Sequence, residues 1–343
     1  QAIAIGLSVD LNDEGGLELS VLLPNLHSVG QSSSSAYTIC SATAHSFAEA
    51  IGLLRTSIPL TLNLAQLKAV IFSQEIAQSD FLHNIVSDMY LTHRLYNAAF
   101  CIVSIGEAKT MLEALVSAPF GARLSSLLLT SLENHTASGR IPDTHFSDFY
   151  YDMHSIYGSP IAILAATADG MHTRLTPEGR AGDALPGALP REGGSQNEYS
   201  GTALFRDQRM VGTLSSLETA WMNYLRGKTM SIDYSCEGTS LTLSPTFPPR
   251  VRIDTQSEQM RIEISARFTV GSQCSIDALT ALIDADLHAL ISKCQSLGVD
   301  PFLFSQRAAA SFPDIPSWEA FGYIDRYITA QVEIDVDVYM TTD

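Results

Sequence analysis

The sequence predicts an α+β fold of mixed α/β character, arranged as three consecutive domains in which a β-sheet packs against helices. The chain has 343 residues, 45% of them hydrophobic, and this length favours more than one hydrophobic core. Over the first half, short apolar runs typical of strands alternate with helical patterns. Beyond residue 228, segments with strict apolar–polar alternation surround one long helical pattern, and this change marks a domain boundary.

The N-terminal domain, residues 1–157, is predicted to be an α/β domain. Residues 1–24 alternate apolar and small residues around an acidic turn and indicate a β-hairpin. Lys68–Phe72 and Ala98–Ile105 are apolar runs that suit buried central strands. Helical patterns follow these runs, so we expect helices to cover the sheet. The domain ends after an aromatic segment, Phe146–Tyr151.

The small middle domain, residues 158–228, begins with another buried strand, predicted over residues 161–168. Residues Thr176–Asn197 are rich in Gly, Pro and charge and have no hydrophobic period, so we expect an exposed loop or a mobile excursion there. A unit of two strands and a helix, residues 201–228, completes the domain.

This ββα unit carries clear local signals. Asp207 and Gln208 mark a two-residue turn between two short apolar strands. Ser215 or Ser216 is a suitable helix N-cap, and Glu218 follows in the first turn, where the helix dipole favours an anion. The apolar face of the helix is formed by Leu217, Trp221 and Leu225. No catalytic group is evident in this unit, so its pattern indicates packing rather than chemistry.

The C-terminal domain, residues 229–343, is predicted to be α+β. A long helix over Ile276–Leu297 has apolar residues at helical spacing and ends at Gly298. The last strand-like segment, Ala330–Tyr339, alternates aliphatic side chains with acids, so one of its faces is expected to be solvated. We expect the long helix to cross a mostly antiparallel sheet.

The net charge and the hydropathy of the chain argue against several kinds of binding partner. The formal net charge of −17 argues against nucleic acid and against adhesion to anionic lipid through a basic patch. No apolar run approaches the ~18–20 residues that span a bilayer. The first residues enter a strand pattern directly, without the basic and apolar regions of a signal peptide. The protein is therefore expected either to be cytosolic or to follow a targeting peptide that was removed.

Cysteine usage indicates neither a disulfide framework nor a zinc knuckle. The number is odd and no two form a C-x-x-C pair. Cys40 and Cys101 lie in apolar runs, where inert buried thiols are expected. One pairing stays open among the five residues, which are Cys40, Cys101, Cys236, Cys274 and Cys294.

No catalytic motif of the hydrolase, metalloprotease, P-loop or dinucleotide-binding type occurs. The one local group of potential ligands is His145, Asp148, Asp152 and His154. On a helix, Asp148 and Asp152 share a face that His145 and His154 do not both join, so we interpret the group as an exposed, aromatic-backed surface. We predict no catalytic, cofactor-binding or metal-binding residues.

Other distinctive residues have structural interpretations. The turn from Asp10 resembles the first half of a calcium loop, but its twelfth place is Val21 instead of Glu, which favours a solvated acidic turn over calcium. His83 and His93 lie ten residues apart on one predicted helix and cannot meet in one site. Asp300 is interpreted as a turn acid and Trp318 as a packing anchor.

Two further functional classes stay open at this point. A metal-free Ser or Asp hydrolase is the enzyme alternative, although nothing assembles a nucleophile with a base. A small-ligand-binding protein is the other, with a pocket in the α/β cleft of the first domain.

Residues 201–228 also carry a family resemblance. Their order is Gly–aliphatic–Phe–basic, a charged turn, Val-Gly-x-Leu, Glu-Thr, a hydrophobic helix and Gly-Lys. This order resembles the hallmark segment of the Ger(x)C family, the C subunits of bacterial spore germinant receptors. The similarity continues in order along the chain, through IAIGLSVDLNDEGGLELSVLL, KAVIFSQEIA, LGVDPFLF and SWEAF. The chain departs from the family pattern at Thr213, where an aromatic residue is frequent, and at Leu303 and Ser305, where glycines are usual.

The resemblance implies a fold of three mixed α/β domains in series and no enzymatic activity. It implies a lipoprotein attached through an N-terminal Cys that precedes this sequence, on the outer face of the spore inner membrane. The implied partners are the A and B membrane subunits of a germinant receptor, with no cofactor and no nucleic acid. The alternative is a soluble extracytoplasmic small-ligand-binding protein, which calorimetry with small nutrients would distinguish.

Overall fold

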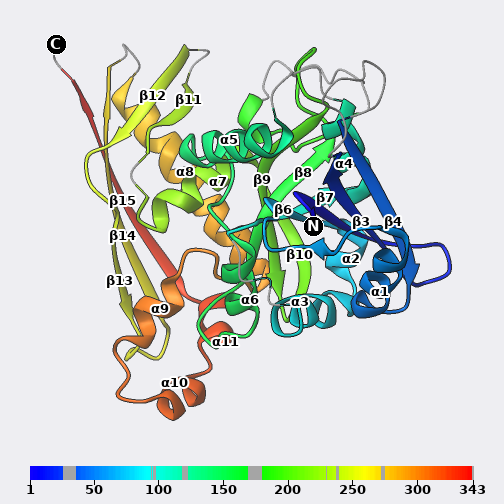
Figure 1. Ribbon diagram of the computed structural model, residues 1–343. Coiled ribbons are helices and arrows are strands. Elements are labelled where there is room, and N and C mark those ends of the chain that lie inside the picture. The colour runs from blue at the N-terminus through cyan, green and yellow to red at the C-terminus, as the bar shows by residue number, and fades with distance from the viewer. Residues whose placement is uncertain are drawn as a thin grey trace.

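The structure is a computed structural model that describes the whole chain except residues 26–35, 94, 96–97, 118–122, 169–179, 229, 237–238, 272–274 and 342–343. Its described strands form an eight-stranded sheet, a five-stranded sheet and a two-stranded ribbon, and helices pack against the two large sheets (Figure 1). The predicted α+β class is confirmed. None of the described helices has the length and apolar character needed to cross a membrane.

The eight-stranded sheet has the order β10-β9-β8-β7-β6-β2-β3-β4. Its strands are β2 (Gly6–Leu11), β3 (Leu17–Pro24), β4 (Tyr37–Ala44), β6 (Ala69–Ser73), β7 (Phe100–Ile105), β8 (Ile161–Thr167), β9 (Asn197–Arg206) and β10 (Arg209–Leu214). Strands β2, β6, β7 and β8 are parallel, whereas β3, β4, β9 and β10 add antiparallel edges. The two-stranded ribbon pairs β1 (Ala2–Ile3) with β5 (Leu62–Asn63).

Helices cover both faces of this sheet, which explains the continuous apolar sequences of its central strands. One face packs against α1 (Phe47–Ser57), α2 (Gln74–Gln78), α3 (Phe81–Leu91) and α6 (Phe146–Met153). The other packs against α4 (Ala108–Ser117) and α5 (Leu124–Ala137). Every residue of β6 is buried as a result.

The predicted boundary between residues 157 and 158 falls between two strands of one sheet. Strand β8 pairs in parallel with β7, with Ile163 opposite Ile102. Six of the seven residues of β8 are buried, and the strand is paired on both sides, with β7 and with β9. Residues 1–157 and 158–228 therefore share a sheet, and a division of the chain into three units stays a prediction.

The C-terminal sheet contains β11 (Ile232–Cys236), β12 (Thr239–Pro245), β13 (Arg250–Asp254), β14 (Arg261–Val270) and β15 (Gln331–Met340). The first four pair antiparallel, as predicted. Strand β15 instead joins β14 in parallel, because the chain returns through a helical crossover. The long helix, α8 (Ile276–Leu297), has the predicted bounds and ends at Gly298 in the left-handed conformation.

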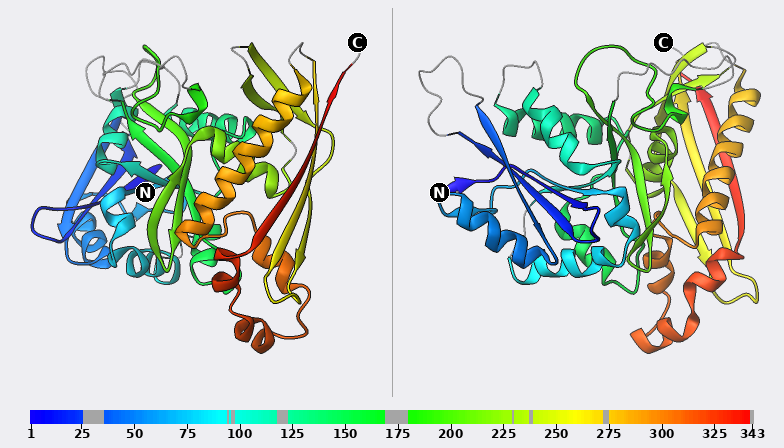
Figure 2. Two further views of the ribbon diagram at one scale, coloured as in Figure 1. Left: turned by 180° about the vertical axis from the view of Figure 1, so that it is seen from behind. Right: turned by 90° about the vertical axis from the view of Figure 1, so that its right-hand side faces the viewer.

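Helix α8 lies between the two large sheets and runs diagonally across the C-terminal one (Figure 2, left). Three short helices that the sequence did not predict follow it. They are α9 (Phe304–Ala309), α10 (Ile315–Phe321) and α11 (Tyr323–Ile328).

The predicted exposed loop over residues 176–197 is half-buried in most of its described part, residues 180–197. A short 3₁₀ turn, Ala181–Asp183, packs against α7 (Ser216–Leu225). Tertiary packing on this helix holds a segment whose sequence has no hydrophobic period, so the prediction of exposure was wrong for its half-buried residues and held for others, such as residues 192–194.

Candidate functional site

Helix α6 separates the histidines of the predicted surface group. His145 is the N-cap, where its backbone N–H donates to Oδ2 of Asp148 (3.3 Å). A hydrogen bond to Asp148 is the main factor that raises the pKa of His145. His154 lies at the other end, with Nδ1 2.8 Å from the carbonyl oxygen of Tyr150 and its ring 5.1 Å from that of His83. The described residues contain no group of three or more His, Cys, Asp or Glu that could hold a metal ion.

The turn that resembles half a calcium loop is organised by Asn12. Its Oδ1 accepts hydrogen bonds from the backbone N–H groups of Glu14 (3.1 Å) and Gly16 (2.6 Å). Asp10 faces the other way and is buried against α4, where it accepts hydrogen bonds from backbone N–H groups. Asp10, the first acid of the apparent calcium loop, therefore binds the N-terminus of α4.

Asp300 and Trp318 have the predicted structural roles. The buried carboxylate of Asp300 accepts hydrogen bonds from the backbone N–H groups of Phe302, Phe304 and Ser305 and thus holds the turn into α9. Trp318 Nε1 donates to the carbonyl of Ile156 (3.2 Å). The Trp318 ring packs within a buried and partly buried aromatic cluster.

Cys101 and Cys294 are buried thiols, and burial raises the pKa of both. This confirms the prediction for Cys101, whereas Cys40 is only half-buried. Cys274 lies outside the described residues.

The ββα unit forms as predicted and lies at the junction between the two large sheets. Asp207 (φ 49°) and Gln208 (φ 72°) form a left-handed two-residue turn between β9 and β10. Ser215 caps α7, and its Oγ and the Glu218 side chain exchange hydrogen bonds with each other's backbone N–H groups. The helix has more than the one expected apolar face: eight of its ten residues are buried because both sheets pack around it.

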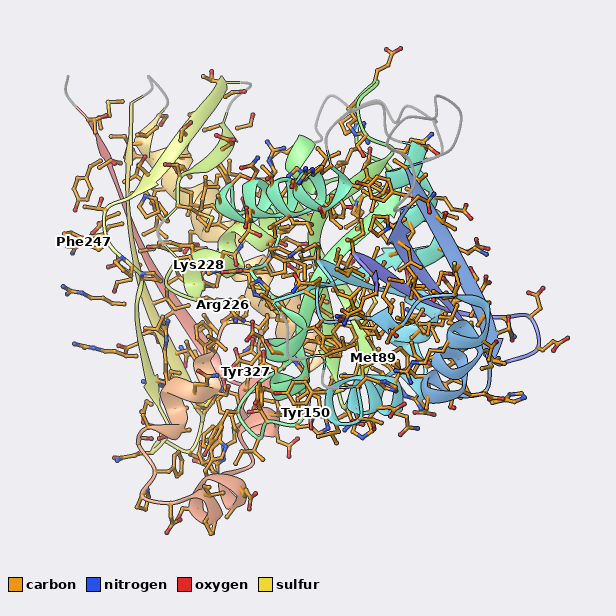
Figure 3. All side chains as sticks on the ribbon, viewed as in Figure 1. Met89, Tyr150, Arg226, Lys228, Phe247 and Tyr327 are labelled. Carbon is orange, nitrogen blue, oxygen red and sulfur yellow. The ribbon has the colours of Figure 1, made fainter. Side chains whose placement is uncertain are left out.

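Side chains at the C-terminal end of α7 bind both halves of the molecule. The amide of Asn223 donates to the carbonyls of Gly139 (3.3 Å) and Ile141 (3.2 Å). Arg226 donates to the carbonyl of Pro301 (2.7 Å), and Lys228 forms an ion pair with Asp143 (3.0 Å). Figure 3 shows Arg226 and Lys228 between the two large sheets.

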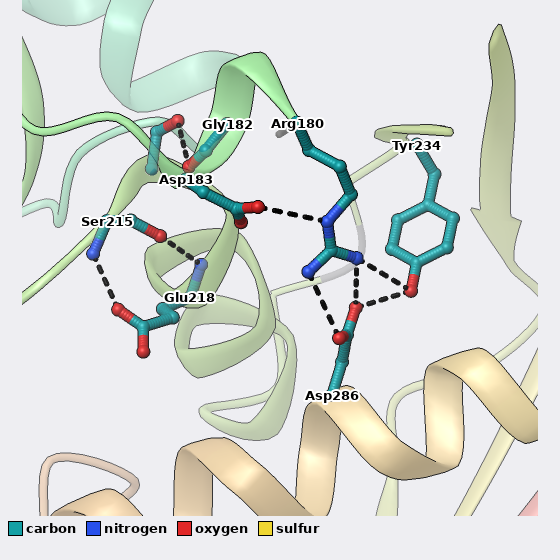
Figure 4. Close-up of polar contacts among 8 residues, drawn as sticks. Arg180, Gly182, Asp183, Ser215, Glu218, Tyr234 and Asp286 are labelled. Atoms are coloured by element: carbon teal, nitrogen blue, oxygen red, sulfur yellow. Dashed lines mark hydrogen bonds and ion pairs between the residues drawn. The ribbon is translucent and has the colours of Figure 1, made fainter. Parts of the chain in front are cut away.

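A second polar network connects the segment after residue 179 to α8 (Figure 4). The guanidinium of Arg180 donates to both carboxylate oxygens of Asp286, at 2.7 and 3.1 Å, and also pairs with Asp183 (3.2 Å). The hydroxyl of Tyr234 donates to the same Asp286. One turn of the 180–197 segment is thereby attached to a strand and a helix of the C-terminal half.

A cavity of about 800 Å³ opens beside this network. It is bounded by the end of α5, the 180–195 segment, β9, the start of α7 and the β11–β12 hairpin. This volume is in the range of small-ligand sites, and junctions between structural units commonly hold such sites. Its polar lining includes His135, Arg140, Arg180, Arg191, Glu198 and Ser200.

Intramolecular partners neutralise two of the three cavity arginines. Arg180 pairs with Asp286, and Nε of Arg191 lies 2.7 Å from Glu198, whose side chain is 2% exposed. Arg140 has no ion-pair partner within the described ranges. Burial, followed by the charge of Arg140, lowers the pKa of His135.

Sequence reasoning did not find these cavity residues, because they come from segments distant in sequence. One local signal was present: Gly201 is a glycine inside a strand pattern, and such a glycine often marks a bulge. The α/β cleft of the first domain, where a ligand pocket was expected, is not where this cavity lies.

Two sequence models of spore germination proteins match the chain in order. "Spore germination protein N-terminal domain" matches residues 1–166, and "Spore germination B3/ GerAC like, C-terminal" matches residues 200–342. Among solved structures, the chain is similar to "Crystal Structure of the GerBC protein", with a TM-score of 0.55 and 12% sequence identity over 100% of this chain and 99% of that chain. At this identity, the similarity shows a shared fold. No match was found among curated proteins.

Proposed function

The chain belongs to the Ger(x)C family of spore germination proteins, and on that premise we propose that it is a non-enzymatic lipoprotein subunit of a spore germinant receptor. The single observation that carries this proposal is the ordered match of both family regions, over residues 1–166 and residues 200–342. We propose that the subunit acts through protein–protein contacts in nutrient-triggered germination.

The proposed partners are the A and B membrane subunits of the receptor. The proposed location is the outer face of the spore inner membrane, with a lipid on a Cys encoded upstream of residue 1. A single acyl chain holds a protein to a bilayer only weakly, so contacts with the membrane subunits would supply the second attachment. The polar networks around α7 support this role, because they hold the two halves together as one body for such contacts.

Co-purification from spores tests the proposal. A C-terminal affinity tag is placed on the chain in its own host, and spore membranes are solubilised in mild detergent. We expect A- and B-type membrane subunits to be recovered with the tagged chain, and we expect deletion of the gene to slow nutrient-triggered germination. A variant in which the upstream lipid-acceptor Cys is replaced by Ala serves as the control and should lose membrane attachment.

The proposal would be contradicted if the wild-type chain were recovered from the soluble fraction without membrane subunits, and if deletion of its gene caused no germination defect. That result would favour the alternative, a soluble extracytoplasmic small-ligand-binding protein. The observation that favours this alternative is the cavity of about 800 Å³ between the two large sheets, here called the junction cavity. A subunit that acts only through protein–protein contacts does not require such a cavity.

A further inference from the structure

Strand β9 contains a bulge beside the junction cavity. Thr202 pairs with Ile163 and Tyr199 with Ala165, so two residues, Ser200 and Gly201, lie opposite a single residue of β8. Gly201 has φ +96°, and a Cβ there would collide with the backbone carbonyl of Leu214. Bulges of this kind redirect neighbouring side chains and occur often at sites of function.

The bulge connects β9 to the loop that carries Arg140. The N–H of Gly201 donates to the carbonyl of Arg140 (2.9 Å), and the N–H of Arg140 donates to the carbonyl of His135 (3.1 Å). His135, Arg140 and Ser200 all line the cavity. Backbone hydrogen bonds thus connect the end of α5, the following loop and β9, and each of these segments contributes a polar residue to the cavity lining.

Ser200 places a hydroxyl on the same wall of the cavity. The residue is 4% exposed and lines the cavity, but its hydroxyl is not among the fully buried, unpaired polar atoms of the described residues. A hydroxyl on the wall of a cavity is a group to which a ligand can form a hydrogen bond.

Arg140 supplies a charge at the same wall. It is exposed and, among the described residues, has no carboxylate partner, in contrast to Arg180 and Arg191. Asp233 on β11 also lines the cavity, and its Oδ1 lies 3.5 Å from the Thr242 hydroxyl. An acid on the β11 wall disfavours a polyanion, so a ligand with one carboxylate fits this charge distribution better.

We propose that the junction cavity binds a small organic monocarboxylate. The guanidinium of Arg140 pairs with the carboxylate, a geometry in which two parallel N–H donors can contact both oxygens. The hydroxyl of Ser200 donates a further hydrogen bond to the ligand. The assignment goes beyond receptor membership and does not depend on it.

Titration of the purified full chain tests the site. Acetate and lactate are the probes, with acetamide and lactamide as neutral isosteres, in calorimetry and thermal-shift assays up to about 20 mM, because so few atoms support only modest affinity. We expect one monocarboxylate to bind with one-to-one stoichiometry, at least about tenfold more tightly than its amide. Arg140→Gln should weaken this binding about tenfold or more, and Ser200→Ala about two- to tenfold.

The unliganded variants separate binding from stability. Ser200→Ala removes one hydroxyl at the cavity wall, and Arg140→Gln keeps the backbone bonds to Gly201 and His135, so both should retain the wild-type Tm without ligand. Arg252→Gln, an exposed arginine on β13, is the matched control and should bind like wild type. Absence of binding by both acids, equal binding of the amides, or unchanged binding by Arg140→Gln would overturn the proposal. None of these results would alter the outcome of co-purification.

Discussion

Asp10 lies on β2, and its side chain reaches the first turn of α4. Its two carboxylate oxygens accept hydrogen bonds from the backbone N–H groups of Ala108 (2.6 Å) and Lys109 (3.0 Å). Asp300 does the same for the turn into α9. Buried carboxylates in this protein thus satisfy backbone donors that would otherwise lie unpaired at helix starts.

Burial makes the Asp10 contact pH-dependent. It raises the pKa of Asp10 to about 6, although the two N–H donors act in the opposite direction. Between pH 4 and 6 the native state therefore binds a proton that the unfolded state releases, and the contribution of Asp10 to the free energy of unfolding falls as pH rises through that window. From pH 5 to pH 8, we expect wild type to lose about 1.4 kcal/mol relative to Asp10→Asn.

Urea denaturation of both proteins at the two pH values measures this difference. Asp13→Asn, in the exposed part of the same hairpin, is the control and should follow the wild-type pH dependence. Parallel pH profiles for wild type and Asp10→Asn would show that the carboxylate does not titrate in this range.

Helix α7 and the 180–197 segment connect elements that are distant in sequence. Trp221 of α7 packs against Phe268 of β14, with ring centroids 5.7 Å apart, and is 1% exposed. Arg180 connects the 3₁₀ turn beside α7 to Asp286 of α8, as Figure 4 shows. Apolar packing by Trp221 and the polar network of Arg180 therefore both attach the region around α7 to the C-terminal half.

The Arg180–Asp286 pair should contribute measurably to stability, since the side chains are only 28% and 15% exposed. Loss of Arg180 leaves a largely buried carboxylate without its cation, which costs more than loss of the pair. We expect Arg180→Met to lower the free energy of unfolding by about 2 kcal/mol, and the Arg180→Met/Asp286→Leu double variant to recover part of that loss.

A double-mutant cycle from urea denaturation gives the coupling energy. The matched control is the exposed pair Arg209–Asp80, with 52% and 82% exposure, where the same cycle should give no more than about 0.5 kcal/mol. Equal coupling energies for the two pairs would mean that the Arg180 network is no stronger than a surface contact.

At the scale of the whole molecule, the two large sheets complete each other's cores. The cluster around the C-terminal sheet includes Ile161, Leu204 and Leu214 from the eight-stranded sheet, together with most of α7. The C-terminal half therefore has an apolar face that is covered only when residues 158–228 are present.

A fragment of residues 229–343 should consequently fail to fold alone. It lacks Trp221 and Tyr224, which are at most 1% exposed and each bury about 200 Å², or about 5 kcal/mol at ~25 cal/mol per Å². That loss is comparable with the whole stability of a typical domain. We expect no cooperative thermal transition by circular dichroism for this fragment, whereas the full chain should show one. A cooperative transition of the fragment would instead support an independent C-terminal domain.

The sequence by itself determined the features that depend on neighbouring residues. The bounds of α8, an N-cap at Ser215 or Ser216, the turn at Asp207–Gln208 and the role of Asp300 were all predicted, because caps, turns and helical periods involve residues within a few positions of each other. The ordered motifs also predicted the family.

Only the tertiary structure decided which strands share a sheet and which side chains meet at the cavity. The pairing of β7 with β8, the parallel addition of β15 and the contact of Arg180 with Asp286 join residues about 60 to 110 positions apart. Arg140 and Ser200 likewise line one cavity, where the bulge at Gly201 donates a backbone hydrogen bond to the loop after α5. No local pattern specifies such neighbours, because they are selected by burial of apolar surface over the whole chain.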